Sequence, residues 1–204
     1  MRCLLFSLLI GAGCAAEYKG LIAVPIDPNC VEKIQPRGIN TTWFDAGVDV
    51  MGKHISGLML IKNMPDSSTR VVFTNEAGVK FFDFEFSGDK SFKVHHVIPQ
   101  LNKNAVIGLL REDFELMLGV PFRSAELQSW ERGEEHFFGA AQKKETAYFI
   151  TSWDCASLLR QEIGSARKRK VSLTSFGDLR QPDSVRLQHH TFNMQIVLKR
   201  LVRE

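Results

Sequence analysis

The side chains best placed for acid–base chemistry are Asp83 and Glu85, which alternate along one predicted strand and lie near Glu76 or His95. A pair of carboxylates can donate and accept protons in a reaction, but charges that alternate along a strand are also simply the solvated face of a sheet. The sequence contains no Gly-x-Ser-x-Gly elbow, no phosphate-binding glycine loop and no His-Glu-x-x-His motif. We therefore expect a protein that is not an enzyme and uses no cofactor.

The thiol of Cys14 is suited to a different chemistry, the attachment of a lipid. The apolar run over residues 3–12 has the character of a signal peptide and is too short to span a bilayer, which takes about 20 apolar residues. Residues 10–14, IGAGC, resemble the lipobox, in which a diacylglyceryl group is attached to the cysteine sulfur before cleavage. Cleavage by signal peptidase I after Ala16 is the alternative. We expect a signal peptide over 1–13 and a Cys14 that carries palmitate-like acyl chains.

Residues 14–40 are predicted to be the lipidated N-terminus and a tether, because they contain Pro25, Pro28, Pro36 and Gly38 with little periodicity. No aspartate directly follows Cys14. By resemblance to known sorting signals, we expect a lipid-anchored protein of the outer membrane that faces the periplasm. The net charge of +3, with 24% charged residues, is typical of an ordinary globular domain and not of a nucleic-acid-binding protein.

Two cysteines, Cys30 and Cys155, remain in the chain after Cys14. Exported proteins live where disulfides form, so a disulfide between these two residues is one prediction. Two separate buried cysteines are the alternative. The sequence has no Cys-x-x-Cys motif, and the histidine pairs at 95–96 and 189–190 would point to opposite faces of strands. We therefore expect no metal site.

The elements that must position these residues are mainly strands. Residues 41–98 are rich in β-branched and aromatic residues, and turn signals at 51–53, 65–68, 76–78 and 87–89 predict five short strands in a meander. Apolar residues three or four positions apart predict a helix that begins at Asn102 or Asn104 and ends at Gly119. Further strands are predicted at 145–153, 169–176 and 184–201, with a short helix at 155–163.

One face of the predicted sheet is strongly apolar. The fourth strand places three phenylalanines on one side, and the fifth is expected to alternate in the same way, with His96 and Ile98 continuing that side. If the sheet curves without closing, this face becomes a cavity for acyl chains, whereas in the alternative it is a filled core. The candidate cavity residues, including one from the predicted helix, are Phe82, Phe84, Phe86, Phe92, Val94 and Phe114.

The segments HISGLMLIK, RVVFTNEAGVKFFDFEF and REDFELML resemble those of LolB-like bacterial outer-membrane lipoproteins, related to the carrier LolA, over about residues 41–118. The resemblance implies an α+β, mainly β fold over 41–204. In this fold, a curved antiparallel sheet forms an open half-barrel with a helix packed on its concave side. It also implies that the protein binds or hands over lipid or lipoprotein acyl chains, with a periplasmic carrier as partner. Met64 would correspond to the apolar residue of a membrane-contact loop.

Two main functional hypotheses follow. In the first, the domain is a lipid- or lipoprotein-handling half-barrel with an open apolar cavity. In the second, it is a structural or complex-forming lipoprotein whose sheet interior is filled and takes no small ligand. The alternation of residues cannot separate these hypotheses, because a filled face and an open one have the same pattern.

Overall fold

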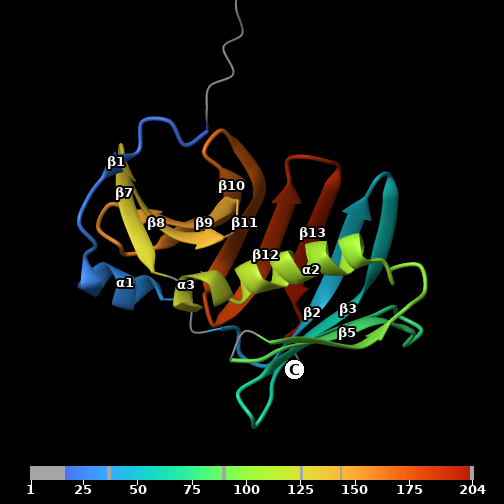
Figure 1. Cartoon of the computed structure of the whole chain (residues 1–204). Helices are drawn as coiled ribbons and strands as arrows, with labels where there is room; N and C mark the ends of the chain where they lie inside the picture. The colour runs from blue at the N-terminus through green and yellow to red at the C-terminus, as the bar shows by residue number, and fades with distance from the viewer. Residues whose placement is uncertain (1–16, 36–37, 89–90, 125, 143, 203–204) are drawn as a thin grey trace, which may run out of the picture.

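A 13-stranded antiparallel sheet dominates the computed structural model, which describes residues 17–35, 38–88, 91–124, 126–142 and 144–202 (Figure 1). The strand order is β1-β7-β8-β9-β10-β11-β12-β13-β2-β3-β4-β5-β6, so β1 and β6 are the edges and the described sheet is not closed. This confirms the predicted mainly β fold with few helices.

The described residues contain three helices, α1 (Pro28–Ile34), α2 (Asn104–Met117) and α3 (Val120–Ser124). The strands are β1 (Ile22–Ala23), β2 (Thr42–Val50), β3 (Lys53–Asn63), β4 (Thr69–Thr74), β5 (Lys80–Phe86), β6 (Phe92–Val97), β7 (Leu127–Arg132), β8 (Glu135–Gln142), β9 (Glu145–Ser152), β10 (Leu158–Ser165), β11 (Lys168–Asp178), β12 (Gln181–His189) and β13 (Met194–Arg200).

The meander from β2 to β6 follows the predicted turn signals. Val50 pairs with Lys53, so Met51 and Gly52 form a two-residue turn with positive φ at both positions. This is the turn conformation that matches the twist of a hairpin. The turn between β4 and β5 is closed by Asn75, whose backbone N–H donates to Val79 O at 2.9 Å. These two connections of the meander therefore have the local turn geometry that the sequence predicts.

The predicted helix is confirmed as α2, but its first turn differs from the expectation. The N-cap is Lys103, which makes no side-chain cap hydrogen bond, so neither Asn102 nor Asn104 is the N-cap residue. The helix ends as predicted, because Gly119 has a positive φ of 69° directly after the C-cap Leu118. None of the helices in the described part of the chain is long and apolar enough to cross a membrane.

β8 and β9 are covered on both faces. Phe137 and Phe138 are successive residues of β8 and must point to opposite faces, yet both are fully buried. Phe138 meets Phe122 of α3, with ring centroids 6.5 Å apart. Phe137 belongs to a second apolar cluster on the outer face, together with Tyr18 and Tyr148. This double cover explains why β8 is a nearly continuous apolar run.

The N-terminal segment provides the outer cover. The ring of Tyr18 stacks on Tyr148 with 4.2 Å between centroids, and its hydroxyl donates to Glu162 Oε2 at 2.9 Å. Gly164 makes room for this ring, because a Cβ at position 164 would lie 2.6 Å from it. The tether predicted over 14–40 therefore does not hold for the described residues from 17 onward, which contain β1 and α1 and pack onto the sheet.

The short helix predicted at 155–163 is wrong, because most of that segment is β10. Leu158, Leu159 and Ile163 have helix-like spacing in the sequence. In the structure, Glu162 is buried on the outer face and the next residue, Ile163, is buried as well. A buried charge conceals the alternation of a strand, so the sequence pattern of this segment is misleading.

Candidate functional site

The phenylalanines of β5 form the centre of the candidate site. Phe82, Phe84 and Phe86 alternate along the strand and are between 0% and 6% exposed. The rings of Phe82 and Phe84 stack with 4.6 Å between centroids. Phe114 of α2, which is fully buried, approaches Phe82 to 5.6 Å and Phe86 to 6.3 Å. The strand and the helix thus bring four of the six predicted lining residues into one packed cluster.

The two predicted residues of β6 lie at the edge of the sheet. Phe92 is partly buried and its ring meets Phe84 at 5.3 Å. Val94 pairs with Phe84 on the same face, but it is 37% exposed because β6 has no further strand beside it. A register shift leaves His95 without a backbone pairing partner in β5, so Val97, and not His96, pairs with Phe82. The regular alternation predicted for this strand is therefore wrong beyond Val94.

A cleft of about 290 Å³ opens beside this cluster, where α2 meets α3. Arg123 donates from Nη2 to the carbonyl oxygen of Leu118 at 3.0 Å, across the junction between the helices. This cleft was not predicted from the sequence, in which the local signal is Gly119, the residue that ends α2. The lining residues are Ser67, Thr69, Phe86, Ser87, Gly88, Leu118, Val120 and Arg123.

Met64 lies in the turn between β3 and β4, next to the cleft residues Ser67 and Thr69. Its backbone N–H donates to Ser68 O at 2.8 Å, and Ser67 N–H donates back to Met64 O at 3.0 Å. Asp66 accepts hydrogen bonds from the backbone and hydroxyl of Ser68. Met64 itself is only half-buried. The turn is thus well defined and leaves part of the Met64 side chain exposed.

Two polar contacts fasten α2 to the middle of the sheet. His189 Nε2 of β12 lies 3.0 Å from Asp113 Oδ2, and both side chains are almost completely buried. Burial raises the pKa of Asp113 above its ordinary value, against the opposing effect of the hydrogen bond with His189. Lys170 of β11 donates to Glu112 at 2.9 Å in a more exposed contact. The helix therefore has an apolar attachment to β5 and a polar attachment to β11 and β12.

The carboxylates considered for acid–base chemistry, Asp83 and Glu85, contact basic side chains of the sheet. Asp83 is 2% exposed and accepts hydrogen bonds from Arg70 Nε at 3.0 Å and Lys80 Nζ at 2.9 Å. Burial alone would raise the pKa of Asp83, but the two cations outweigh it and lower the pKa below its ordinary value. Glu85 lies 2.7 Å from His95 Nε2. The expectation that Asp83 lies on a solvated face is wrong, because Arg70 and Lys80 cover it.

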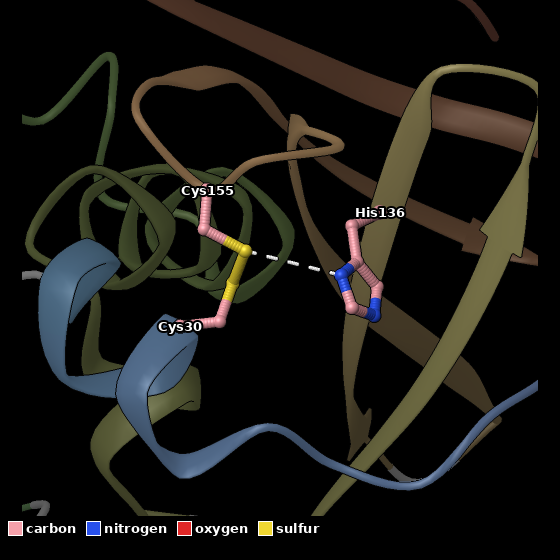
Figure 2. A group of neighbouring side chains, drawn as sticks. All are labelled: Cys30, His136 and Cys155. Carbon is pink, nitrogen blue, oxygen red and sulfur yellow. Dashed lines mark hydrogen bonds between the residues drawn. A yellow bond between two sulfur atoms is a disulfide. The ribbon is translucent and has the colours of Figure 1, made fainter.

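Cys30 of α1 and Cys155, in the turn after β9, form the predicted disulfide, with their Cα atoms 5.4 Å apart. Their separation of 125 residues means that this bond joins the N-terminal segment to the turn between β9 and β10. His136 of β8 lies beside it, with Nδ1 3.9 Å from Cys155 Sγ (Figure 2). Cys14, the predicted lipidation site, lies outside the described residues.

Comparison with known proteins gives a match at the level of the fold. No protein-family model and no curated protein sequence matches this chain. A LolA superfamily protein from Nitrosomonas europaea is similar in structure, with a TM-score of 0.53, 6% identity and coverage of 89% of this chain and 95% of that one. A domain described as an outer membrane lipoprotein-sorting protein, from Vibrio parahaemolyticus, has a TM-score of 0.51 and 7% identity, covering 85% of this chain and 88% of that one.

Identities of 6–7% carry no argument about individual residues, so the likeness concerns the path of the chain. It agrees with the resemblance to LolA in the sequence, and it does not distinguish a LolB-type receptor from other proteins of this shape. On this evidence, the chain has a LolA-like fold: an open antiparallel sheet with few helices.

Proposed function

We propose that this protein binds acyl chains of lipids or lipoproteins between α2 and the apolar face of the sheet, as a LolB-like receptor or a related carrier. The observation that carries the proposal is that neighbouring residues of α2 contact strands that are far apart in the sheet order. Asp113 and Phe114 are neighbours on the helix, yet they contact His189 of β12 and Phe82 of β5.

Five strand-to-strand steps separate β12 from β5, which is about 24 Å on a flat sheet at about 4.8 Å per step. Side chains of a flat sheet stand roughly parallel, so their tips would stay that far apart. Adjacent residues of one helix have Cα atoms only about 3.8 Å apart. Contacts to both strands therefore support the proposal that the sheet wraps around the helix, with α2 on the concave side of an open half-barrel.

Acyl binding in this arrangement requires a movement of α2, because the phenylalanine cluster fills the space beneath the helix. The cleft beside Val120 offers the starting point, since Phe86 and Leu118 line it and Phe86 also contacts Phe114. Each methylene that leaves water for an apolar site gains about 0.8 kcal/mol. A chain of a dozen or more carbons can thus offset the loss of ring contacts and the cost of ordering.

Titration of the delipidated protein with a fluorescent fatty acid tests this proposal. Wild-type protein should bind saturably, and Val120→Trp, which fills the cleft, should bind about tenfold more weakly if two methylene groups are excluded. Val79→Trp is the matched control, because Val79 is 53% exposed in the turn at the opposite end of β4 and β5. This control should bind like wild type.

The packed rings of Phe82, Phe84 and Phe114 favour a second candidate, the structural or complex-forming lipoprotein with a filled core. Absence of saturable binding by the delipidated wild-type protein would decide for this candidate. Neither candidate includes a catalytic step, in keeping with the proposal that the protein is not an enzyme. The name of the Vibrio parahaemolyticus domain supports the first candidate.

The proposal includes a lipid anchor at Cys14 that holds the domain on the outer membrane, facing the periplasm. Metabolic labelling with a palmitate analogue should label the wild-type protein, and Cys14→Ala should abolish the label. Cys3→Ala is the matched control, since this residue lies in the predicted signal peptide and its loss should leave labelling intact. An unlabelled mature protein that begins at Glu17 would contradict the anchor and favour cleavage after Ala16.

A further inference from the structure

Three side chains that carry metal-binding atoms meet between α1, β8 and the turn after β9. The Sγ atoms of Cys30 and Cys155 and a ring nitrogen of His136 all lie within 4.8 Å of one another, and all three residues are buried (Figure 2). Their separation in the sequence hides this cluster from motif analysis, which predicted no metal site. We propose that the cluster binds Zn²⁺ when the Cys30–Cys155 disulfide is reduced.

The backbone geometry suits the two cysteines both as a disulfide and as zinc-bound thiolates. Their Cα atoms are 5.4 Å apart, within the range of about 4.4–6.8 Å that a disulfide accepts. In a tetrahedral zinc site with Zn–S bonds of about 2.3 Å, the two sulfur atoms are about 3.8 Å apart. Rotation of the cysteine side chains reaches this separation while α1 and the turn after β9 stay in place.

The neighbours of His136 orient it as a metal ligand. Its Nε2 lies 2.9 Å from Ser129 Oγ and 3.9 Å from Glu131 Oε1. In the tautomer that carries its proton on Nε2, the ring donates to Ser129, and the lone pair of Nδ1 faces the sulfur atoms. Metal-bound histidines commonly donate their other N–H to such a partner, which fixes the ring and the tautomer.

A cleft of about 460 Å³ gives a cation access to the cluster, since Cys30, Cys155 and His136 all line it. Asp27, Glu131 and Asp154 also line the cleft, against a single lysine, Lys33, so carboxylates outnumber cationic side chains at the entrance. Two thiolates and an imidazole leave the fourth tetrahedral position to water or to an oxygen ligand. This donor set matches the preference of Zn²⁺ for sulfur and nitrogen.

A dithiol reductant can convert the Cys30–Cys155 disulfide into the two thiols that the metal site requires. The reductant transfers two electrons to the protein disulfide, becomes a disulfide itself, and leaves Cys30 and Cys155 as two thiols. Zn²⁺ then binds to both sulfur atoms and to Nδ1 of His136, and two protons are released. Reoxidation reverses the sequence, because a disulfide sulfur is no longer a thiolate ligand, and the metal is expelled.

Cobalt spectroscopy tests the site in the full chain carrying Cys3→Ser and Cys14→Ser, so that only Cys30 and Cys155 supply thiols. After reduction, titration with Co²⁺ should produce thiolate-to-cobalt charge-transfer bands and the visible bands of tetrahedral cobalt at one metal per chain. Zn²⁺ should displace the cobalt. Oxidation by a small disulfide should release the bound metal.

Variants separate a built site from adventitious binding to free thiols. His136→Ala should weaken binding more than tenfold, and Ser129→Ala about tenfold, through the orientation of the ring. His190→Ala is the matched control, because His190 also lies 2.9 Å from a serine hydroxyl, that of Ser172. The preceding His189 pairs with Val171, which pairs with Ile163, so His190 is near the end of β10 that is remote from Cys155.

Absence of the cobalt bands in the reduced chain would overturn the proposal. Bands that persist unchanged in His136→Ala would also overturn it, because they would report thiols of an unfolded or rearranged chain. The fold of His136→Ala can be checked independently by circular dichroism of its oxidised form, in which the disulfide is intact.

Discussion

Two buried carboxylates, Glu162 and Asp83, each accept hydrogen bonds from several side chains of this protein. Glu162 is 1% exposed and accepts hydrogen bonds from Arg160 Nε at 2.8 Å, Arg169 Nη1 at 2.9 Å and Tyr18 Oη at 2.9 Å. Asp83 has a similar set of cationic partners. A buried charge is tolerated when it is paired and hydrogen-bonded, and it becomes costly when one partner is removed.

Replacing Asp83 by asparagine should lower the free energy of unfolding by about 2 kcal/mol near neutral pH, because hydrogen bonds to an ionised group contribute about 1.5–3 kcal/mol. A carboxyl whose pKa is lowered on folding stabilises the fold above its unfolded pKa of about 3.9, and this stabilisation is lost as the pH falls through the folded value. The difference between wild type and Asp83→Asn should therefore shrink below about pH 4.

Urea unfolding across this pH range measures the effect, with Asp45→Asn as control because Asp45 is an exposed aspartate of β2. A difference that stays constant with pH would mean that the carboxylate charge of Asp83 contributes nothing to stability.

At the level of single residues, the sequence predicted the apolar side of β5 well. Phe82, Phe84 and Phe86 are buried as a strand period of two requires. The burial of Asp83 was not predictable from the same period, because its partner Arg70 lies 13 positions away on another strand. Only the pairing of β4 with β5 brings the two together.

Among the elements, α2 is attached to β12 of the sheet by a buried polar pair. The Asp113–His189 pair is buried, and within the described residues Asp113 Oδ1 and His189 Nδ1 have no hydrogen-bond partner. An ion or hydrogen-bonded pair in such a place has a large desolvation cost, so its replacement by apolar residues is often neutral, whereas the loss of one partner is not.

The two leucine variants of this pair should therefore be strongly coupled. Asp113→Leu and His189→Leu should each destabilise the protein by about 3 kcal/mol, and the double variant should be more stable than the sum of the two effects by at least about 1 kcal/mol. Chemical denaturation of wild type, both single variants and the double variant measures this. Additive effects would mean that the contact does not couple the helix to β12.

The elements were predictable where their signals are local. The apolar spacing identified α2 and the turn residues identified the meander from β2 to β6, because both depend on neighbours in the sequence. β10 was mistaken for a helix, and the segment that contains α1 and β1 for a tether, because partners distant in the sequence stabilise them. Tyr18 and Glu162, for instance, are 144 positions apart.

For the whole molecule, the resemblance to LolA in the sequence anticipated the observed fold, an open antiparallel sheet. The order of the strands was not predictable, since β13 returns to pair with β2 and joins the first and last parts of the chain. The state of the apolar face was not predictable either. Whether phenylalanines fill a core or line a cavity depends on the distance between the sheet and α2, which alternation does not encode.

The docking of Tyr18 has a consequence for how the domain stands on a bilayer. Cys14 precedes Tyr18 by four positions, and four residues span at most about 14 Å. With Cys14 acylated as proposed, only a short segment connects the lipid anchor to the folded domain. The face of β9 and β10 that contacts Tyr18 must then stay near the lipid headgroups. A carrier that delivers lipid or lipoprotein would therefore have to bind to another side of the domain. Inserting residues before Tyr18 would lengthen this segment and free this orientation while leaving the fold unchanged.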